Sequence, residues 1–170
     1  MTAKVAATAH SRLPPSQLFD LLADPRGCMT WHDHPEKDRP QSIDAAPGLA
    51  LAGAEYWTRG LCGKFTWRAR TTVTAADPAR RYATETEVIF AHPRVPKVRS
   101  SERFVLEPNE AGCLVRYETE VSNDDVGLSW LARTYLALAN RFVVERSLRN
   151  NFLHVLKAAE SEATRSSARS

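Results

Sequence analysis

The sequence has few of the features that mark the common classes of enzyme. It has only three cysteines among its 170 residues, Cys28, Cys62 and Cys113, at wide spacing and without a C-x-x-C pair. This argues against a disulfide framework, a zinc ribbon and a thioredoxin-like motif. No glycine-rich phosphate loop precedes a predicted helix, and no Gly-x-Ser-x-Gly elbow is present. The chain therefore shows no signature of a nucleotide enzyme or a serine hydrolase.

Long apolar runs and concentrated charge are also missing. No apolar run approaches the roughly 20 residues that a membrane span needs. The segment Met1 to Val5 lacks the apolar core of a signal peptide. The net charge is only +3 and the basic residues are spread along the chain, which disfavours a nucleic-acid partner. We expect a cytoplasmic protein with reduced thiols and no membrane span. The oligomeric state is left open.

The composition is that of an ordinary globular domain. Apolar residues make up 43% of the chain and charged residues 25%. A chain of this length buries about 70% of the surface that its unfolded form exposes, so it needs no disulfide or metal to stabilise it. No internal repeat or linker divides it. We predict a single domain over residues 1–160, followed by a frayed polar tail over 161–170.

The order of the predicted elements indicates an α+β fold. Residues 3–12 alternate as a strand, and Pro14 and Pro15 then start a short helix that ends near Ala23. A second short helix or turn follows. From residue 53 to residue 123 the chain is poor in helix and alternates with period two, as strands do. Residues 127–160 carry an apolar stripe at steps of three and four, which predicts one long helix. The simplest compact arrangement is a curved antiparallel sheet wrapped around that helix.

Alternation along the strands also assigns faces. It places aromatic side chains, several with polar tips, on the side of the sheet that faces the helix. Such side chains are suited to binding a flat, partly oxygenated molecule, and they are equally suited to ordinary core packing. Both interpretations stay open for each residue. The candidate ligand-binding residues are Trp67, Tyr82, Phe104, Tyr117 and, on the helix, Tyr135.

Glu102 and His32 are the candidate catalytic groups. Glu102 shares its predicted face with Phe104, where burial of the carboxyl would raise its pKa and allow general acid–base chemistry. A local change of register would instead turn it to solvent. His32 lies in the segment His32-Asp33-His34, either at the mouth of a pocket or in a solvated loop. No third ligand follows at a useful spacing, so we predict no metal site and no cofactor.

Three segments carry a resemblance to a known family. Leu18 to Pro25 followed by Trp31 resembles the opening helix, the Asp-Pro and the downstream tryptophan of the START-like or SRPBCC superfamily. Ala76 to Tyr82 resembles the turn before its mid-sheet strand. Arg103 to Pro108 with Gly112 resembles its last hairpin. The chain is most similar to polyketide cyclase/dehydrase-type members.

The resemblance implies a helix-grip fold with two short helices after the first strand, and a cavity between the sheet and the C-terminal helix. It also implies a small hydrophobic ligand, aromatic or polyketide-like, as the partner. Known members bind sterols, lipids, plant metabolites or polyketides, and many catalyse nothing. Three functions therefore stay open. They are cyclisation with dehydration of the bound molecule, non-catalytic carriage or sensing of a lipid-like ligand, and protein interaction through the outer sheet or the long helix.

Overall fold

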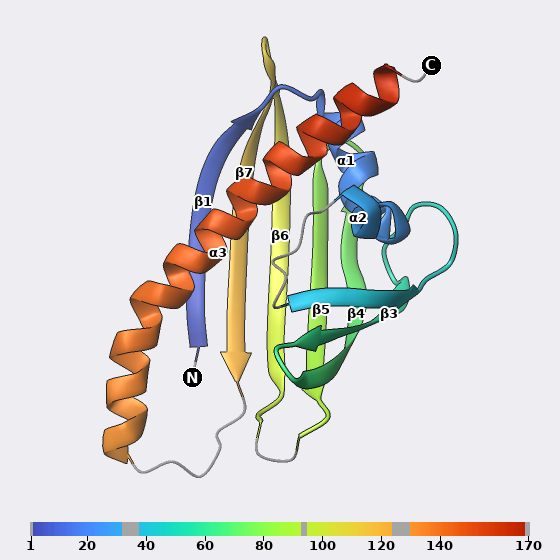
Figure 1. Ribbon diagram of the computed structural model, residues 1–170. Helices are drawn as coiled ribbons and strands as arrows, with labels where there is room; N and C mark the ends of the chain where they lie inside the picture. The colour runs from blue at the N-terminus through green and yellow to red at the C-terminus, as the bar shows by residue number, and fades with distance from the viewer. Residues whose placement is uncertain (1, 32–37, 93–94, 124–129, 169–170) are drawn as a thin grey trace.

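The computed structural model describes residues 2–31, 38–92, 95–123 and 130–168. One antiparallel sheet forms one layer, and three helices lie against one of its faces (Figure 1). The sheet has seven strands in the order β1-β7-β6-β5-β4-β3-β2. Apart from the pairing of β1 with β7, each strand pairs with its neighbour in sequence. The elements are β1 Thr2–Ser11, α1 Pro15–Ala23, α2 Pro25–Trp31, β2 Asp38–Asp44, β3 Glu55–Cys62, β4 Phe65–Asp77, β5 Arg81–Phe90, β6 Val98–Asn109, β7 Gly112–Asn123 and α3 Trp130–Ser167.

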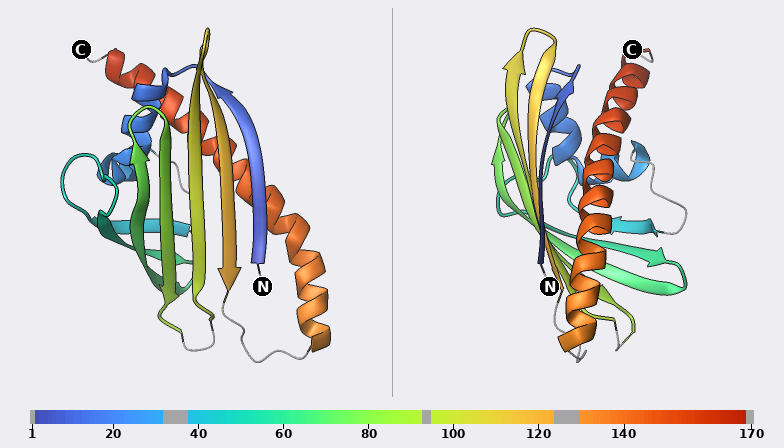
Figure 2. Two further views of the ribbon diagram at one scale, coloured as in Figure 1. Left: turned by 180° about the vertical axis from the view of Figure 1, so that it is seen from behind. Right: turned by 90° about the vertical axis from the view of Figure 1, so that its left-hand side faces the viewer.

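The first and last strands in the sequence are neighbours in the sheet, because β1 pairs with β7 along its whole length. Gly112 begins β7 with φ +139°, and a Cβ there would lie 2.3 Å from the carbonyl oxygen of Ser11. Only glycine accepts both the positive φ and that close approach. At the other end, β2, β3 and the start of β4 turn away from the rest of the sheet (Figure 2). A bulge between Val73 and Ala75 interrupts the pairing of β4 with β5, and bulges of this kind bend a strand.

The two short helices begin where their sequences allow. Pro15 opens α1, where a missing N–H costs nothing. Before α2, the Asp24 carboxylate accepts hydrogen bonds from the backbone N–H groups of Arg26 and Gly27, at 3.1 and 3.0 Å. The Arg26 guanidinium in turn donates to the carbonyl of Ala45 at 2.8 Å. These bonds fix α2 against the loop that follows β2.

The long helix α3 continues to Ser167, so the predicted helix end near residue 160 is wrong. Ala159 and Ala163 are both buried, and they extend the stripe of Phe152 and Leu156 by two further turns. Alanine side chains at helical spacing are therefore enough to continue the packing of α3 beyond residue 160. Glu160 also ties the helix to the sheet, because its carboxylate accepts hydrogen bonds from Ser11 Oγ at 3.1 Å and from the backbone N–H that follows at 2.8 Å.

The hydrophobic core lies between α1, the C-terminal half of α3 and the ends of β5, β6 and β7 nearest to them. Its largest fully buried side chains are Phe19, Tyr117 and Phe152. The Tyr117 and Phe152 rings stack, with centroids 4.7 Å apart and planes 3° from parallel. Through Phe152 the helix therefore packs on the aromatic face of the sheet, which confirms the predicted helix-grip arrangement. Among the described helices, none combines the length and apolar character required to cross a lipid bilayer.

Candidate functional site

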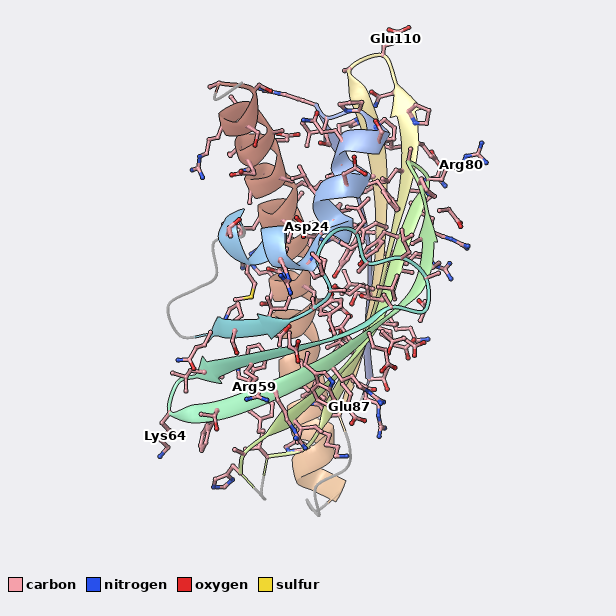
Figure 3. The ribbon with its side chains drawn as sticks, turned by 90° about the vertical axis from the view of Figure 1, so that its right-hand side faces the viewer. Asp24, Arg59, Lys64, Arg80, Glu87 and Glu110 are labelled. Atoms are coloured by element: carbon pink, nitrogen blue, oxygen red, sulfur yellow. The ribbon has the colours of Figure 1, made fainter. Side chains whose placement is uncertain are left out.

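The concave side of the sheet is hollow away from this core. A cavity of about 470 Å³, open to solvent, lies between α1, α2 and the inner face of β2 to β6. Figure 3 looks toward this side, where the β3–β4 hairpin marked by Arg59 and Lys64 extends below α2. The helix wall consists of Leu22, Pro25, Cys28 and Met29. The sheet contributes Pro40, Ile43, Tyr56, Thr58, Cys62, Trp67, Ala69, Thr71, Thr86, Val88, Phe90 and Val98.

The described wall of the cavity comes from α1, α2 and the sheet. The resemblance placed the cavity between the sheet and the C-terminal helix; among the side chains of α3 that the structure describes, residues 145–167, none lines it. These side chains are occupied elsewhere, since Phe152 and Leu156 fill the core beside β6 and β7. The helices α1 and α2 lie in front of the sheet (Figure 1) and supply the helical residues of the described lining. Among the described side chains, those of α3 that pack on the sheet and those of α1 and α2 that border the cavity therefore belong to different elements.

A small polar group interrupts the apolar lining. The hydroxyl oxygens of Thr71 and Thr86, on neighbouring strands, lie 3.0 Å apart. Tyr56 is hydrogen-bonded to Thr71, and burial raises the pKa of Tyr56 to about 12 although that bond acts in the opposite direction. All three side chains thus stay neutral near pH 7. They form a line of hydroxyls across β3, β4 and β5 that can donate to or accept from a ligand oxygen.

Cys28 faces this group from α2. Burial raises the pKa of its thiol to about 12, and the negative charges of Glu102 and Asp24 act in the same direction. A thiol with such a pKa is protonated at neutral pH and is a poor nucleophile. Cys28 therefore contributes a weak polar contact to the wall, and nucleophilic catalysis through it is disfavoured.

Glu102 points to the inner face of the sheet, at the border between the core and the cavity. Tyr117 donates a hydrogen bond from Oη to Glu102 Oε1 at 2.7 Å. Burial raises the pKa of Glu102 above the ordinary range of glutamate, and the bond from Tyr117 opposes that shift. Glu102 pairs in register with Thr84, two residues before the cavity-lining Thr86 on β5, so the carboxyl lies near the cavity wall. Its charge acts to raise the pKa values of Cys28 and Tyr56. The local change of register that would have turned Glu102 to solvent does not occur, because β6 pairs without interruption on both sides.

The other predicted site residues separate into three groups. Trp67 lines the cavity. Tyr82, Phe104 and Tyr117 lie in the hydrophobic core, at 4%, 8% and 1% exposure. His32 lies outside the described residues, and the side chain of Tyr135 is likewise outside them. The structure brings together Glu102 and Tyr117, and it separates Trp67 from the core aromatics by position along the strands.

Tyr56, Thr71, Thr86 and Cys28 are cavity residues that were not among the sequence-based candidates. Strand alternation predicts that Thr71 shares a face with Trp67 and that Thr86 shares a face with Tyr82. Threonine is common in strands, however, so its presence on that face does not by itself indicate a site. Tyr56 gave a weaker signal, because it begins a short strand. Cys28 gave none, since its role depends on how α2 packs.

Comparison with known proteins agrees with this geometry. Residues 2–153 match the family model described as polyketide cyclase / dehydrase and lipid transport. No curated protein matches the chain. Among solved structures, the Mll3558 protein from Rhizobium loti has a TM-score of 0.66 at 13% identity, over 93% of this chain and 97% of its own.

Two further structures show the same fold. A putative uncharacterized protein from Rhizobium leguminosarum has a TM-score of 0.67 at 12% identity, over 97% of this chain and 96% of its own. Ara h 8.0201 has a TM-score of 0.64 at 18% identity, over 95% of this chain and 97% of its own. Identities this low establish the fold alone, a Bet v1-like helix-grip. The family match spans most of the sequence, and the chain belongs to the polyketide cyclase/dehydrase and lipid transport family of the SRPBCC superfamily.

Proposed function

We propose that the protein binds a small hydrophobic molecule, aromatic or polyketide-like, in the cavity under α1 and α2. The observation that carries this proposal is the combination of size and lining. A cavity of about 470 Å³ falls within the roughly 300–1,000 Å³ of typical small-molecule sites. Its wall is mostly aliphatic and aromatic, with Trp67 and Phe90 as flat surfaces and one line of hydroxyls from Tyr56 to Thr86. Such a wall is suited to a flat, partly oxygenated ligand.

The direct test is to fill the cavity. Ala69 lies on the cavity floor and is 5% exposed, so Ala69→Phe places a ring where the ligand would lie. We expect the affinity for 2-naphthol, measured by calorimetry, to fall at least about tenfold. Thr66→Phe is the matched control, because Thr66 is exposed and three residues earlier on the opposite face of the same strand. Equal binding by wild type and Ala69→Phe would place the ligand elsewhere.

Turnover of the bound molecule is the second candidate function, and Glu102 is the observation that favours it. A carboxyl with a raised pKa, held by Tyr117 at 2.7 Å, is suited to proton transfer. In a cyclisation with dehydration, the cavity would hold a reactive chain folded and exclude water, and Glu102 would move a proton. Loss of turnover of a polyketide-like chain in Glu102→Gln, but not in the outer-face control Glu118→Gln, would support this.

Carriage without chemistry is the alternative, and the same experiment separates the two. A carrier needs the cavity but no positioned acid or base. Glu102→Gln with unchanged turnover would remove Glu102 from a catalytic role, and binding without any turnover in wild type would favour the carrier. The cytoplasmic location expected from the thiols stays a prediction.

A further inference from the structure

We propose that the cavity selects neutral ligands that present a hydroxyl or carbonyl oxygen, and that it rejects carboxylates and other anions of the same shape. This inference rests on the proposed ligand-binding function. It narrows the ligand class to phenols, alcohols and ketones, as against free fatty acids or aromatic acids.

The first observation is the kind of polar group at the cavity. The polar side chains of the described lining are the hydroxyls of Tyr56, Thr58, Thr71 and Thr86, the thiols of Cys28 and Cys62, and the indole N–H of Trp67. Within the described lining there is no lysine, arginine or histidine. An anion that enters this wall would leave water and meet only neutral dipoles. Uncompensated burial of a carboxylate costs several kcal/mol, whereas a neutral hydroxyl keeps most of its hydrogen bonding.

The second observation is the acidic group beside the wall. Glu102 pairs in register with Thr84 on β5, two residues before Thr86, whose side chain lines the cavity on the same face of that strand. Glu102 accepts a hydrogen bond from the neutral Tyr117 phenol, and no cation pairs with it among the residues that the structure describes. When ionised, Glu102 repels a ligand anion; when protonated, it offers that anion no countercharge. In either state it adds to the bias against negative ligands.

The third observation is a buried hydroxyl without a partner. Tyr82 is 4% exposed, and among the described residues its Oη has no hydrogen-bond partner. Tyr82 packs edge-on against Phe19, with ring centroids 6.0 Å apart. The core cluster that contains Tyr82 packs against Cys28 and Tyr56, two residues of the cavity wall. A buried phenol next to a cavity wall, with no acceptor of its own, is suited to donate to a ligand oxygen.

The test uses two matched ligand pairs that differ in charge at pH 7. These are 2-naphthol with 2-naphthoate, and decanol with decanoate, titrated into the full chain by calorimetry. We expect the neutral member of each pair to bind at least about tenfold tighter. Equal affinity within a pair, or tighter binding of the acid anion, would overturn the inference while leaving the proposed function intact. If none of the four probes binds, the proposed function fails and this inference fails with it.

Two variants make the cause explicit. Tyr82→Phe removes only the hydroxyl, so 2-naphthol should bind several-fold more weakly while 2-methylnaphthalene, which has no oxygen, binds unchanged. Equal effects on both ligands would show that Tyr82 acts only by packing.

Met29→Lys adds a cation to the helix wall at a half-buried position, and it should raise the affinity for 2-naphthoate relative to 2-naphthol. If it leaves that ratio unchanged in a protein that remains folded by circular dichroism, missing positive charge is not the basis of the selection.

Discussion

The packed half and the hollow half of the inner sheet face share strands β4, β5 and β6 and differ in what covers them. In the packed half, the rings of Phe104 and Tyr117 lie with their centroids 4.9 Å apart, and Tyr117 stacks on Phe152 of α3. In the hollow half, the same strands continue as Val98 on β6 and Val88 on β5, and these border the cavity. Strand alternation is identical in both halves. Among the described residues, the buried side chains of α3, Phe152 to Ala163, belong to the packed half, and α1 and α2 border the hollow half.

The border between the halves is where the polar groups gather. Along β6 the inner residues run from Leu106 and Phe104 in the core, through Glu102, to Val98 in the cavity. Along β5 they run from Tyr82 in the core to Thr86 in the cavity. A carboxyl and a phenol therefore stand where packed side chains give way to open space. Buried polar groups at such a border have access to a ligand that groups inside the core lack.

The largest expected contrast between the halves is in stability. Phe152→Ala removes a fully buried ring from the packed half and should lower the free energy of unfolding by about 3–5 kcal/mol. Val88→Ala removes two methyl groups that already border the cavity, and should cost about 1 kcal/mol. Urea unfolding measures both. Leu153→Ala, at a position that is 41% exposed, is the control for helix α3. Equal losses for Phe152→Ala and Val88→Ala would contradict the division into halves.

A smaller loss is expected at the border. Tyr117→Phe removes the hydrogen bond to Glu102 and leaves a part-buried carboxyl without its donor, while the stacking on Phe152 is retained. We expect a loss of about 1–3 kcal/mol in the free energy of unfolding at neutral pH. In a Glu102→Leu background, which offers Tyr117 no acceptor, the same substitution should cost less. A double-mutant cycle by urea unfolding measures the coupling, and additive losses would show that the bond contributes nothing.

The border also predicts a dependence of stability on pH. Burial raises the pKa of Glu102 in the folded state, so the folded protein holds this proton more tightly than the unfolded chain does. Glu102 therefore favours folding below the ordinary glutamate pKa of about 4.3, and this contribution is lost as the pH rises through the raised value. Relative to wild type, Glu102→Gln should become progressively more stable across that range. Unfolding midpoints between pH 4 and pH 8 test this, with Glu118→Gln on the outer face as the control. A constant difference at all pH values would contradict it.

The smallest effect concerns the thiol in the hollow half. Because the pKa of Cys28 is raised to about 12, its alkylation by iodoacetamide at pH 8 should be much slower than that of glutathione. A bound ligand should slow it further, since Cys28 lines the cavity. Peptide mapping by mass spectrometry after timed alkylation gives the rate. Alkylation as fast as that of glutathione, with no protection by 2-naphthol, would mean that the thiol is freely exposed.

Much of the fold could be predicted from the sequence, because it depends on local patterns. Alternation identified the strands from 55 to 123 and placed Glu102 and Trp67 on the inner face, and prolines marked the start of α1. The end of α3 was missed because the burial of Ala163 depends on contacts distant in sequence. The division of the inner face could not be predicted for the same reason. Parity treats Tyr82 and Trp67 alike, and only the positions of α1, α2 and α3 decide that one is core and the other lines a cavity.

The site was accessible to sequence reasoning only in part. A carboxylate at an apolar position is rare enough to be noticed, which is why Glu102 was a candidate. Threonines in strands are too common to be noticed, and the Thr71–Thr86 contact depends on the register of β4 with β5. Cys28 depends on the angle at which α2 packs on the sheet. Features that depend on strand register and on helix packing cannot be predicted from local sequence patterns.

The most direct test of the account is to map where a ligand binds. In an NMR titration of the labelled full chain with 2-naphthol, we predict amide shifts concentrated at Tyr56, Thr71, Thr86 and Val88, with little change at Val115 and Leu156 in the packed half. That result would place the ligand in the hollow half. Shifts on the outer sheet face, or shifts centred on the packed half, would contradict the claim that this cavity is the functional site.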